Sequence, residues 1–270
     1  MTASAPSSRQ GRQRHEHHET VLHFAAPLPK LESFDRFLFL SPHPDDIEIG
    51  AGATAAKLAA MGKEVTFLIC TDGRYGLRHA PKGITPEELI PLRQEEQRAS
   101  AKKLGVTDVR FLPLSDGGLY TDDELCRGIA AVMGDVQPEV LLAPDPCVHS
   151  ECHIDHLRCG EAARRMVFAA HSEHIMARLG GKKAPTEAIA YYMTAKPNVF
   201  VSTRGYFQRQ LDALFTSHLS QFPPDIPDSR QLRFYLKLRA LDFGLRSGKG
   251  LAEGFRLLDA THMHCLPEAD

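Results

Sequence analysis

Short apolar runs that alternate with helix-like segments are the feature that most constrains the fold of this chain. Four runs are apolar on both faces, and each is followed by a segment that leads back into another run. The predicted strands cover 36–41, 64–71, 109–114 and 139–143. The predicted helices cover 47–61, 92–104 with Gly105 as a cap, and 121–134, which opens on a capping box. This alternation predicts a mainly parallel sheet with helices on both faces and right-handed crossovers.

The remainder of the chain continues the same pattern less regularly. We expect one long helix over 157–179, a loop over 180–185, strands over 188–193 and 199–203, and helices over 208–219 and 230–245. The predicted fold class is α/β, a Rossmann-like three-layer sandwich with a mainly parallel sheet and a C-terminal extension. Residues 1–21 are rich in Ser, Gln, Arg and His, which predicts a disordered tail before a single domain over 22–270.

Composition and charge exclude several classes of partner. The 43% hydrophobic and 24% charged residues are typical of a globular chain, and no apolar run reaches the ~20 residues of a membrane helix. A net charge of -2 with scattered basic residues gives no electrostatic footprint for nucleic acid or anionic lipid. We therefore expect neither a nucleic-acid partner nor a membrane. Six cysteines without a C-x-x-C pair favour reduced thiols in a cytoplasmic protein.

Polar clusters follow each of the four predicted strands. In open parallel sheets, ligands bind outside the carboxyl ends of the strands, so these clusters should share one edge. They are PHPDD at 42–46, TDGRYG at 71–76, Asp116 with Gly117, and a longer run that contains His149, His153, Asp155 and His156.

A divalent metal site explains these clusters best. His43 and Asp46 offer a nitrogen and an oxygen ligand from a turn stiffened by two prolines. One histidine from the fourth run would give two histidines and a carboxylate, which leaves a coordination position open for water, as in catalytic zinc sites. Asp45 would remain unliganded and able to act as a base.

Each fragment alone also has a purely structural interpretation. Segment 42–46 can cap the following helix, and HIDH at 153–156 can begin a helix with Asp155 as its cap. Their joint occurrence after neighbouring strands favours the metal site. Three other patterns are interpreted as structural or surface features: the tail histidines, His171 with His174, and Gly50 with Gly52.

The motifs resemble those of the LmbE/PIG-L-like zinc N-deacetylases. The matching segments are PHPDD at 42–46, GAG at 50–52, TDG at 71–73, HIDH at 153–156, HLSQ at 218–221 and AEGF at 252–255. The TDGRYG run, the length and the ending Met263-His264 look most like the diacetylchitobiose deacetylase branch of that family.

This resemblance implies a role for each candidate residue. Zinc would be bound by His43, Asp46 and His156, with Asp45 as the general base and with His153, supported by Asp155, stabilising the oxyanion. Arg93, Asp116 and His264 would line a sugar pocket, and His264 could do so in the site of a neighbouring subunit; Asp72 and Arg74 are further candidates for substrate contacts. The implied reaction removes the acetyl group from an N-acetylglucosamine-containing sugar, such as diacetylchitobiose, to give acetate and a free amine. The resemblance also implies a Zn²⁺ enzyme that forms a homo-oligomer, a trimer or a hexamer.

Three alternatives to this function stay open. Within the same class, the substrate could be a thiol-linked N-acetylglucosaminide, because the loops that decide it are not placed by sequence. Two histidines and a carboxylate also define the iron(II) oxygenase triad, although that triad usually presents His-x-Asp on a β-barrel. A non-catalytic nucleotide-binding or scaffold protein would leave the clustered ligands unexplained.

Overall fold

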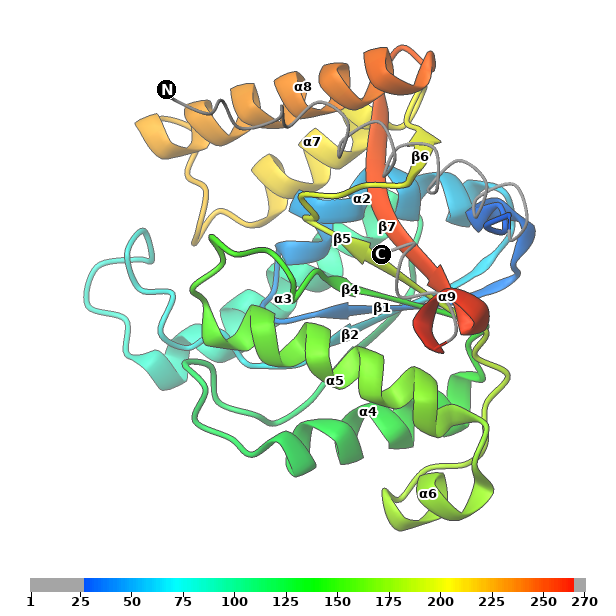
Figure 1. The fold of residues 1–270 in the computed structure, drawn as a ribbon. Helices are drawn as coiled ribbons and strands as arrows, with labels where there is room; N and C mark the ends of the chain where they lie inside the picture. Colours follow the sequence, from blue (N-terminus) through cyan, green and yellow to red (C-terminus); the bar gives the residue numbers. More distant parts are fainter. Residues whose placement is uncertain (1–26, 265–270) are drawn as a thin grey trace, which may run out of the picture.

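The computed structural model describes residues 27–264, whose centre is a seven-stranded sheet with helices on both faces (Figure 1). The strands are β1 (Arg36–Ser41), β2 (Glu64–Ile69), β3 (Asp108–Phe111), β4 (Val140–Pro144), β5 (Ala188–Tyr192), β6 (Val199–Ser202) and β7 (Ala252–Asp259). Their order is β3-β2-β1-β4-β5-β7-β6. Only the pairings that β7 makes with β5 and β6 are antiparallel. The predicted α/β class with a mainly parallel sheet is confirmed.

Helices form the outer two layers. On one face lie α2 (Asp46–Ala60), α3 (Pro86–Leu104), α7 (Phe207–Ser217) and α8 (Pro227–Ser247); on the other lie α4 (Asp122–Val136), α5 (Ile154–Ala170) and α6 (Glu173–Arg178). A 3-10 turn, η1 (Leu31–Ser33), precedes β1, and α9 (Ala260–His264) follows β7. β1 shows why both faces are covered, because Phe37 and Phe39 pack with α2 whereas Leu38 and Leu40 pack with α4 and α5.

The connections after β1 and β4 position the site. These strands are neighbours in the sheet, but β1 leads into α2 on one face and β4 leads into α5 on the other. Such a change of direction opens a crevice beyond the carboxyl ends of the two strands. The segments 42–45 and 145–153 therefore lie at the same edge of the sheet.

α3 and β7 differ from the sequence-based expectation. α3 begins at Pro86 and not at residue 92, because Thr85 and Glu88 form a capping box and Pro91 is accommodated inside the helix. β7 was not predicted, since its apolar run is interrupted by Glu253, Gly254 and Arg256.

The prediction of one helix over 157–179 is wrong. α5 ends at Ala170, and α6 starts after Ser172, whose side chain accepts a hydrogen bond from the backbone N–H of Ile175. A serine at this position is a preferred N-cap, so the chain re-initiates a helix here. The apolar periodicity continues across the break because Val167 and Met176 belong to the same core.

The predicted tail over 1–21 lies outside the described residues. Within 27–264, no helix combines the length and the apolar character that crossing a membrane requires.

Candidate metal centre

The turn that follows β1 is held by hydrogen bonds of its own. Ser41 Oγ donates to the carbonyl oxygen of His43 at 2.6 Å, and the His43 backbone N–H donates to Asp46 Oδ2 at 2.9 Å. Asp45 adopts a φ of 115°, a backbone conformation that non-glycine residues rarely take and that is often found at functional sites. This turn carries His43, Asp45 and Asp46 at the end of β1.

His43, Asp46 and His156 come together at the crevice. One ligand atom from each of them lies within 4.8 Å of the other two. His43 Nδ1 is 3.1 Å from Asp46 Oδ2, and His156 Nε2 is 3.4 Å from Asp46 Oδ1. A second group, His43 with His153 and Asp155, meets the same distance criterion. The first group contains His156, in the first turn of α5, as the predicted third ligand.

The charges around His43 fit a cation. Burial opposes a charge on this ring, but hydrogen bonds to Asp155 and Asp46 outweigh it and raise the pKa of His43 to about 10. Surroundings that hold an extra proton so firmly also stabilise a divalent ion in its place. Two imidazoles and one carboxylate form a donor set that suits zinc and leaves room for water.

Asp155 lies closer to His43, a candidate metal ligand, than to His153, which is 3.7 Å away at Nδ1. Its Oδ2 is 3.1 Å from His43 Nε2, and its two oxygens accept the backbone N–H groups of Gly117 and Gly118 at 2.7 and 2.9 Å. Burial would raise the pKa of this carboxyl, but these hydrogen bonds lower it to about 2. The Nε2 contact turns Nδ1 of His43 toward Asp46, which is the usual role of a carboxylate behind a metal-binding histidine.

Asp45 has a different environment from its neighbour Asp46. Its Oδ2 accepts a hydrogen bond from Arg93 Nη2 at 2.9 Å, and its backbone N–H donates to Gln97 Oε1 at 2.9 Å. Burial raises the pKa of the Asp45 carboxyl to about 6, although the Arg93 charge works against that rise. A carboxyl with this pKa can exchange a proton near neutral pH.

His153 is the N-cap of α5 and lies at the open side of the centre. Its ring centroid is 4.5 Å from that of His43 and 5.1 Å from that of His156. The Asp155 backbone N–H donates to its Nδ1 at 3.4 Å, so the remaining ring nitrogen, Nε2, carries the proton. The side chain is 48% exposed and can meet a bound molecule.

The other predicted substrate residues are engaged with one another or with the backbone. Arg74 Nη2 donates to Asp72 Oδ2 at 2.6 Å, and Asp116 accepts the backbone N–H of Tyr75 at 3.2 Å. Arg93 is buried, and its two terminal nitrogens donate to the carbonyls of Gly73 and Pro44 as well as to Asp45. Contacts between these side chains and a sugar stay predictions.

The structure does not bring His264 to the centre of its own chain. It ends α9, which follows the antiparallel strand β7 and lies at the end of the sheet opposite to the crevice (Figure 1). A role for His264 therefore requires the site of a second chain.

Sequence reasoning missed three residues that support the centre. Glu151 Oε2 is 3.2 Å from His156 Nδ1, on the far side of that ring from Asp46. Gln97 holds the Asp45 backbone and also donates to Glu48 Oε1 at 2.8 Å, and Glu48 is fully buried. Of these three residues, only Glu151 could have been found from sequence, because it is an acidic residue two positions before His153.

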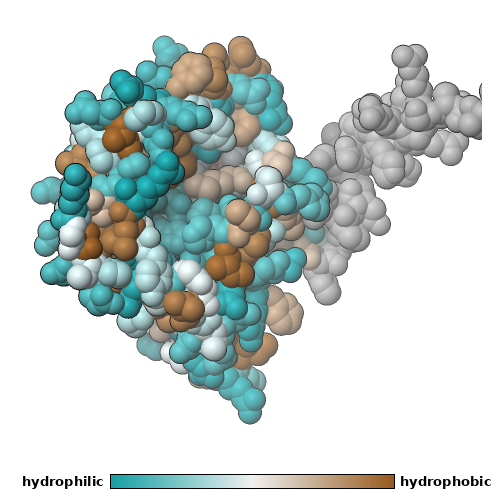
Figure 2. All heavy atoms as spheres, turned by 90° about the vertical axis from the view of Figure 1, so that its left-hand side faces the viewer, coloured by the Kyte–Doolittle hydropathy of each residue, from teal (hydrophilic) through white to brown (hydrophobic). Residues whose placement is uncertain are grey.

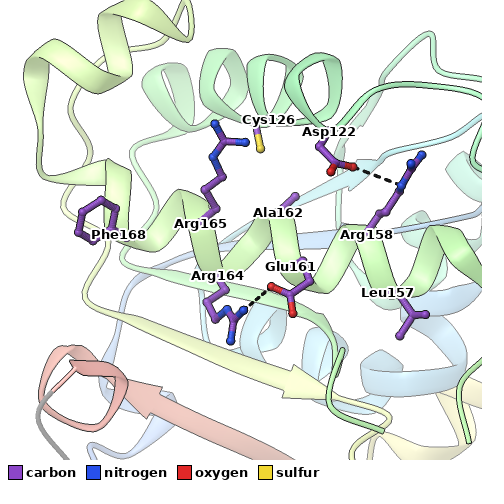
Figure 3. A pocket seen from close by; sticks show the side chains of 9 residues that line it. All are labelled: Asp122, Cys126, Leu157, Arg158, Glu161, Ala162, Arg164, Arg165 and Phe168. Atoms are coloured by element: carbon purple, nitrogen blue, oxygen red, sulfur yellow. Dashed lines mark hydrogen bonds and ion pairs between the residues drawn. The ribbon is translucent and has the colours of Figure 1, made fainter. Parts of the chain in front are cut away.

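A separate hollow lies on the outer side of α4 and α5 (Figure 3). Four of its charged side chains form two pairs, with Arg164 Nη2 2.6 Å from Glu161 Oε2 and Arg158 Nε 3.2 Å from Asp122 Oδ1. None of the three metal-binding candidates lines it, and we assign it no ligand.

A mixed α/β sheet with a His–Asp–His set at its switch point is typical of a metal-dependent enzyme, most simply a hydrolase. Comparison with known proteins supports this class. The pattern of the family described as "PIG-L: GlcNAc-PI de-N-acetylase" matches residues 38–167. A diacetylchitobiose deacetylase from Thermococcus kodakarensis is 34% identical over 257 residues, which cover 91% of this chain and 94% of that protein.

Two further relatives extend the comparison. A 1D-myo-inositol 2-acetamido-2-deoxy-alpha-D-glucopyranoside deacetylase from Streptomyces avermitilis is 32% identical over 65% of this chain and 66% of that protein. The structure of N,N'-diacetylchitobiose deacetylase from Pyrococcus horikoshii superposes with a TM-score of 0.81 at 28% identity, covering 98% of this chain and 97% of that one. The chain belongs to the PIG-L family of de-N-acetylases, as the resemblance indicated.

Proposed function

We propose that this protein is a metal-dependent N-deacetylase that removes the acetyl group from an N-acetylglucosamine unit of a small glycoside, such as diacetylchitobiose. The observation that carries the proposal is the convergence of His43, Asp46 and His156 within 4.8 Å, beside a carboxyl group held apart from them. The long match to a diacetylchitobiose deacetylase supports the same substrate class.

His43, Asp46 and His156 would hold the ion, for which zinc is the best candidate. A bound divalent ion would supply Lewis acidity and make water acidic enough to lose a proton near neutral pH. Asp45 would accept a proton from the water whose oxygen attacks the acetamide carbonyl. Arg93 engages Oδ2 of this carboxylate, and no donor among residues 27–264 engages its Oδ1, which is the natural proton acceptor.

His153 and Asp45 complete the reaction. The Nε2–H of His153, on a half-exposed side chain next to the centre, would donate to the oxyanion that forms on the former carbonyl oxygen. Asp45 returns its proton to the amide nitrogen, the C–N bond breaks, and acetate and the free amino sugar leave. The pKa of about 6 suits Asp45 to both proton transfers.

A second substrate of the same class is favoured by one observation. The Streptomyces avermitilis relative is named as a deacetylase of an N-acetylglucosamine unit attached to inositol, which is a polyol ring. An iron oxygenase or a binding protein has no comparable support.

The direct test is to incubate metal-replete protein with N-acetylglucosamine, with diacetylchitobiose and with the inositol glycoside. The released amine and acetate are then quantified. We expect equal amounts of the two products, loss of activity with a chelator and recovery with zinc. Absence of amine from all three substrates while the ion stays bound would refute the deacetylase proposal.

The protein is further proposed to be cytoplasmic and homo-oligomeric, a trimer or a hexamer. The five described cysteines are free thiols, which fits a reducing compartment. The position of α9 opposite to the crevice means that His264 can reach a site only in another copy.

A further inference from the structure

Three exposed apolar side chains stand beside the polar crevice. Tyr75 is 51% exposed, Leu119 is 66% exposed and Ile154 is 41% exposed. They come from three separate segments: the loop after β2, the loop after β3 and the first residue of α5. We call these three residues the apolar rim. Large apolar side chains that gather next to a polar site often mark a surface that binds something.

A glycine turn brings the apolar rim together. Gly117 and Gly118 both have positive φ values, of 77° and 73°. A Cβ at Gly117 would lie 3.6 Å from the Tyr75 ring, and one at Gly118 would lie 2.9 Å from Ile154 Cγ2. The two side chains therefore pack on either side of a turn that carries no side chain of its own, and Leu119 follows directly.

The rim is fixed relative to the proposed metal ligands. Asp155 accepts both backbone N–H groups of the glycine turn and also contacts His43 Nε2. The Tyr75 backbone N–H donates to Asp116, one residue before the turn. Hydrogen bonds thus tie the rim to the same carboxylate that contacts His43.

Figure 2 shows the left-hand side of Figure 1, toward which the carboxyl ends of the parallel strands point. A hollow lined mainly by hydrophilic surface lies in the middle of this face, and separate apolar patches stand around it. If a molecule places a polar group in the hollow, the rest of that molecule lies against the apolar patches and the polar surface around the opening.

We propose that the apolar rim binds the second ring of a two-ring substrate, with one face of that ring against the Tyr75 side chain. This inference rests on the proposed deacetylase function and adds to it a preference for a glycoside over the single sugar. The C–H groups of a pyranose or inositol ring form an apolar face, whereas its hydroxyl edge is polar. The exposed phenol ring suits that face, and Arg74 and Asp116 beside it suit that edge.

The first test compares substrates of one and two rings. Tyr75→Ala should lower kcat/KM for diacetylchitobiose by about five- to tenfold, the loss expected for one aromatic contact. The same variant should leave kcat/KM for N-acetylglucosamine within about twofold of the unsubstituted protein. The single sugar has no second ring to contact Tyr75, so it loses no binding energy when this side chain is removed. Phe168→Ala is the matched control, because Phe168 is 76% exposed and lies far along α5 from His156.

A second readout does not depend on turnover. The chain contains no tryptophan, so Tyr75→Trp combined with Asp45→Asn places a single reporter at the rim of an inactivated protein. Diacetylchitobiose should change the emission of this tryptophan saturably, and N-acetylglucosamine should not. Phe168→Trp in the same background should respond to neither sugar.

The two proposals fail in different ways. If the unsubstituted protein releases no amine from any N-acetyl sugar, the deacetylase function is wrong. If it does release amine, but Tyr75→Ala changes both substrates equally or neither, the rim proposal is wrong. Binding of the disaccharide without a change in the emission of Tyr75→Trp would also overturn it.

Discussion

Two adjacent aspartates in this protein acquire different chemistry from their surroundings. Burial would raise the pKa of Asp46, but its contacts with two histidines outweigh burial, so this pKa falls well below the usual value. Asp45 is buried beside a single arginine, and burial raises its pKa to about 6. The φ of 115° at Asp45 is the means by which consecutive side chains reach separate positions. One carboxylate is thereby suited to an ion and the other to a proton.

Asp45→Asn and His156→Ala separate these two roles. The asparagine keeps an oxygen for Arg93 but accepts no proton, so we expect full metal content and turnover lower by about 10²–10⁴-fold. His156→Ala removes a ligand and should lose both the ion and the activity. Metal analysis after dialysis and amine release measure the two effects. Near-normal turnover by Asp45→Asn would show that another group is the base.

Gln97 is expected to act by holding the strained Asp45 backbone. Its Oε1 accepts the Asp45 N–H and its Nε2 donates to Glu48, with all three residues buried. Gln97→Leu leaves that N–H unsatisfied, which costs about 1–3 kcal/mol of unfolding free energy. Turnover should fall on the order of tenfold through misplacement of the base, while metal content stays unchanged.

Gln208→Leu provides the control for Gln97, since Gln208 is exposed and, within 27–264, its side chain bonds only to Asp212 of the same helix. Chemical denaturation and amine release, measured on both variants, test the expectation. Equal effects of the two substitutions would count against a positioning role for Gln97.

At the scale of elements, local patterns identified most of the sheet because its strands are apolar on both faces. β1 shows this plainly, since its predicted bounds at 36–41 are those of the structure. β7 escaped notice because its buried polar residues are satisfied by partners far away in sequence. Glu253 accepts the backbone N–H groups of Ala53 and Thr54, and Arg256 pairs with Asp145. No local pattern contains that information.

The same limit applies to the candidate site. The positions of His43, Asp46 and His156 just beyond the ends of strands were accessible from sequence, because parallel strands present their carboxyl ends together. Which histidine Asp155 contacts was not accessible from sequence. The choice between His43 and His153 depends on the direction that the Asp155 side chain takes in the first turn of α5. The contact to His43 spans 112 residues of chain, and that to His153 spans two.

The pair of Asp145 and Arg256 links the end of β4 to β7 and should make stability depend on pH. Burial would raise the pKa of the Asp145 carboxyl, but hydrogen bonds from Arg256 and Thr194 outweigh it and lower the pKa. A lowered folded-state pKa contributes stability above the unfolded value of about 3.9, and that contribution is lost as the pH falls through the folded value.

Asp145→Asn should therefore lower the free energy of unfolding by about 3 kcal/mol at pH 7, because the side chains of both partners are buried. The difference from the unsubstituted protein should shrink below about pH 4. Asp242→Asn, on the exposed side of α8, is the control and should have little effect at any pH. Denaturation curves at a series of pH values provide the measurement. A difference that is constant with pH would contradict the assignment.

At the scale of the whole molecule, the sheet separates the crevice from His264, the residue that the family resemblance assigns to the sugar pocket. The crevice lies beyond the carboxyl ends of β1 and β4, whereas α9 lies at the opposite end, because β7 runs antiparallel to β5. A homo-oligomer can bring α9 of one copy to the crevice of another. In such an assembly each active site would be completed by two chains.

Mixed oligomers test this shared site. Asp45→Asn chains lack the base but carry His264, and His264→Ala chains carry the base but lack His264, so each variant alone should be weakly active. In a random mixture, a complete site requires one chain of each kind in the correct order, which predicts recovery at about a quarter of the sites. The two proteins are denatured, mixed and refolded together, and amine release is compared with that of each variant treated alone. Recovery that appears only after mixed refolding supports the shared site. Activity of the mixture equal to the mean of its components, from particles shown by light scattering to be mixed oligomers, would place a complete site within one chain.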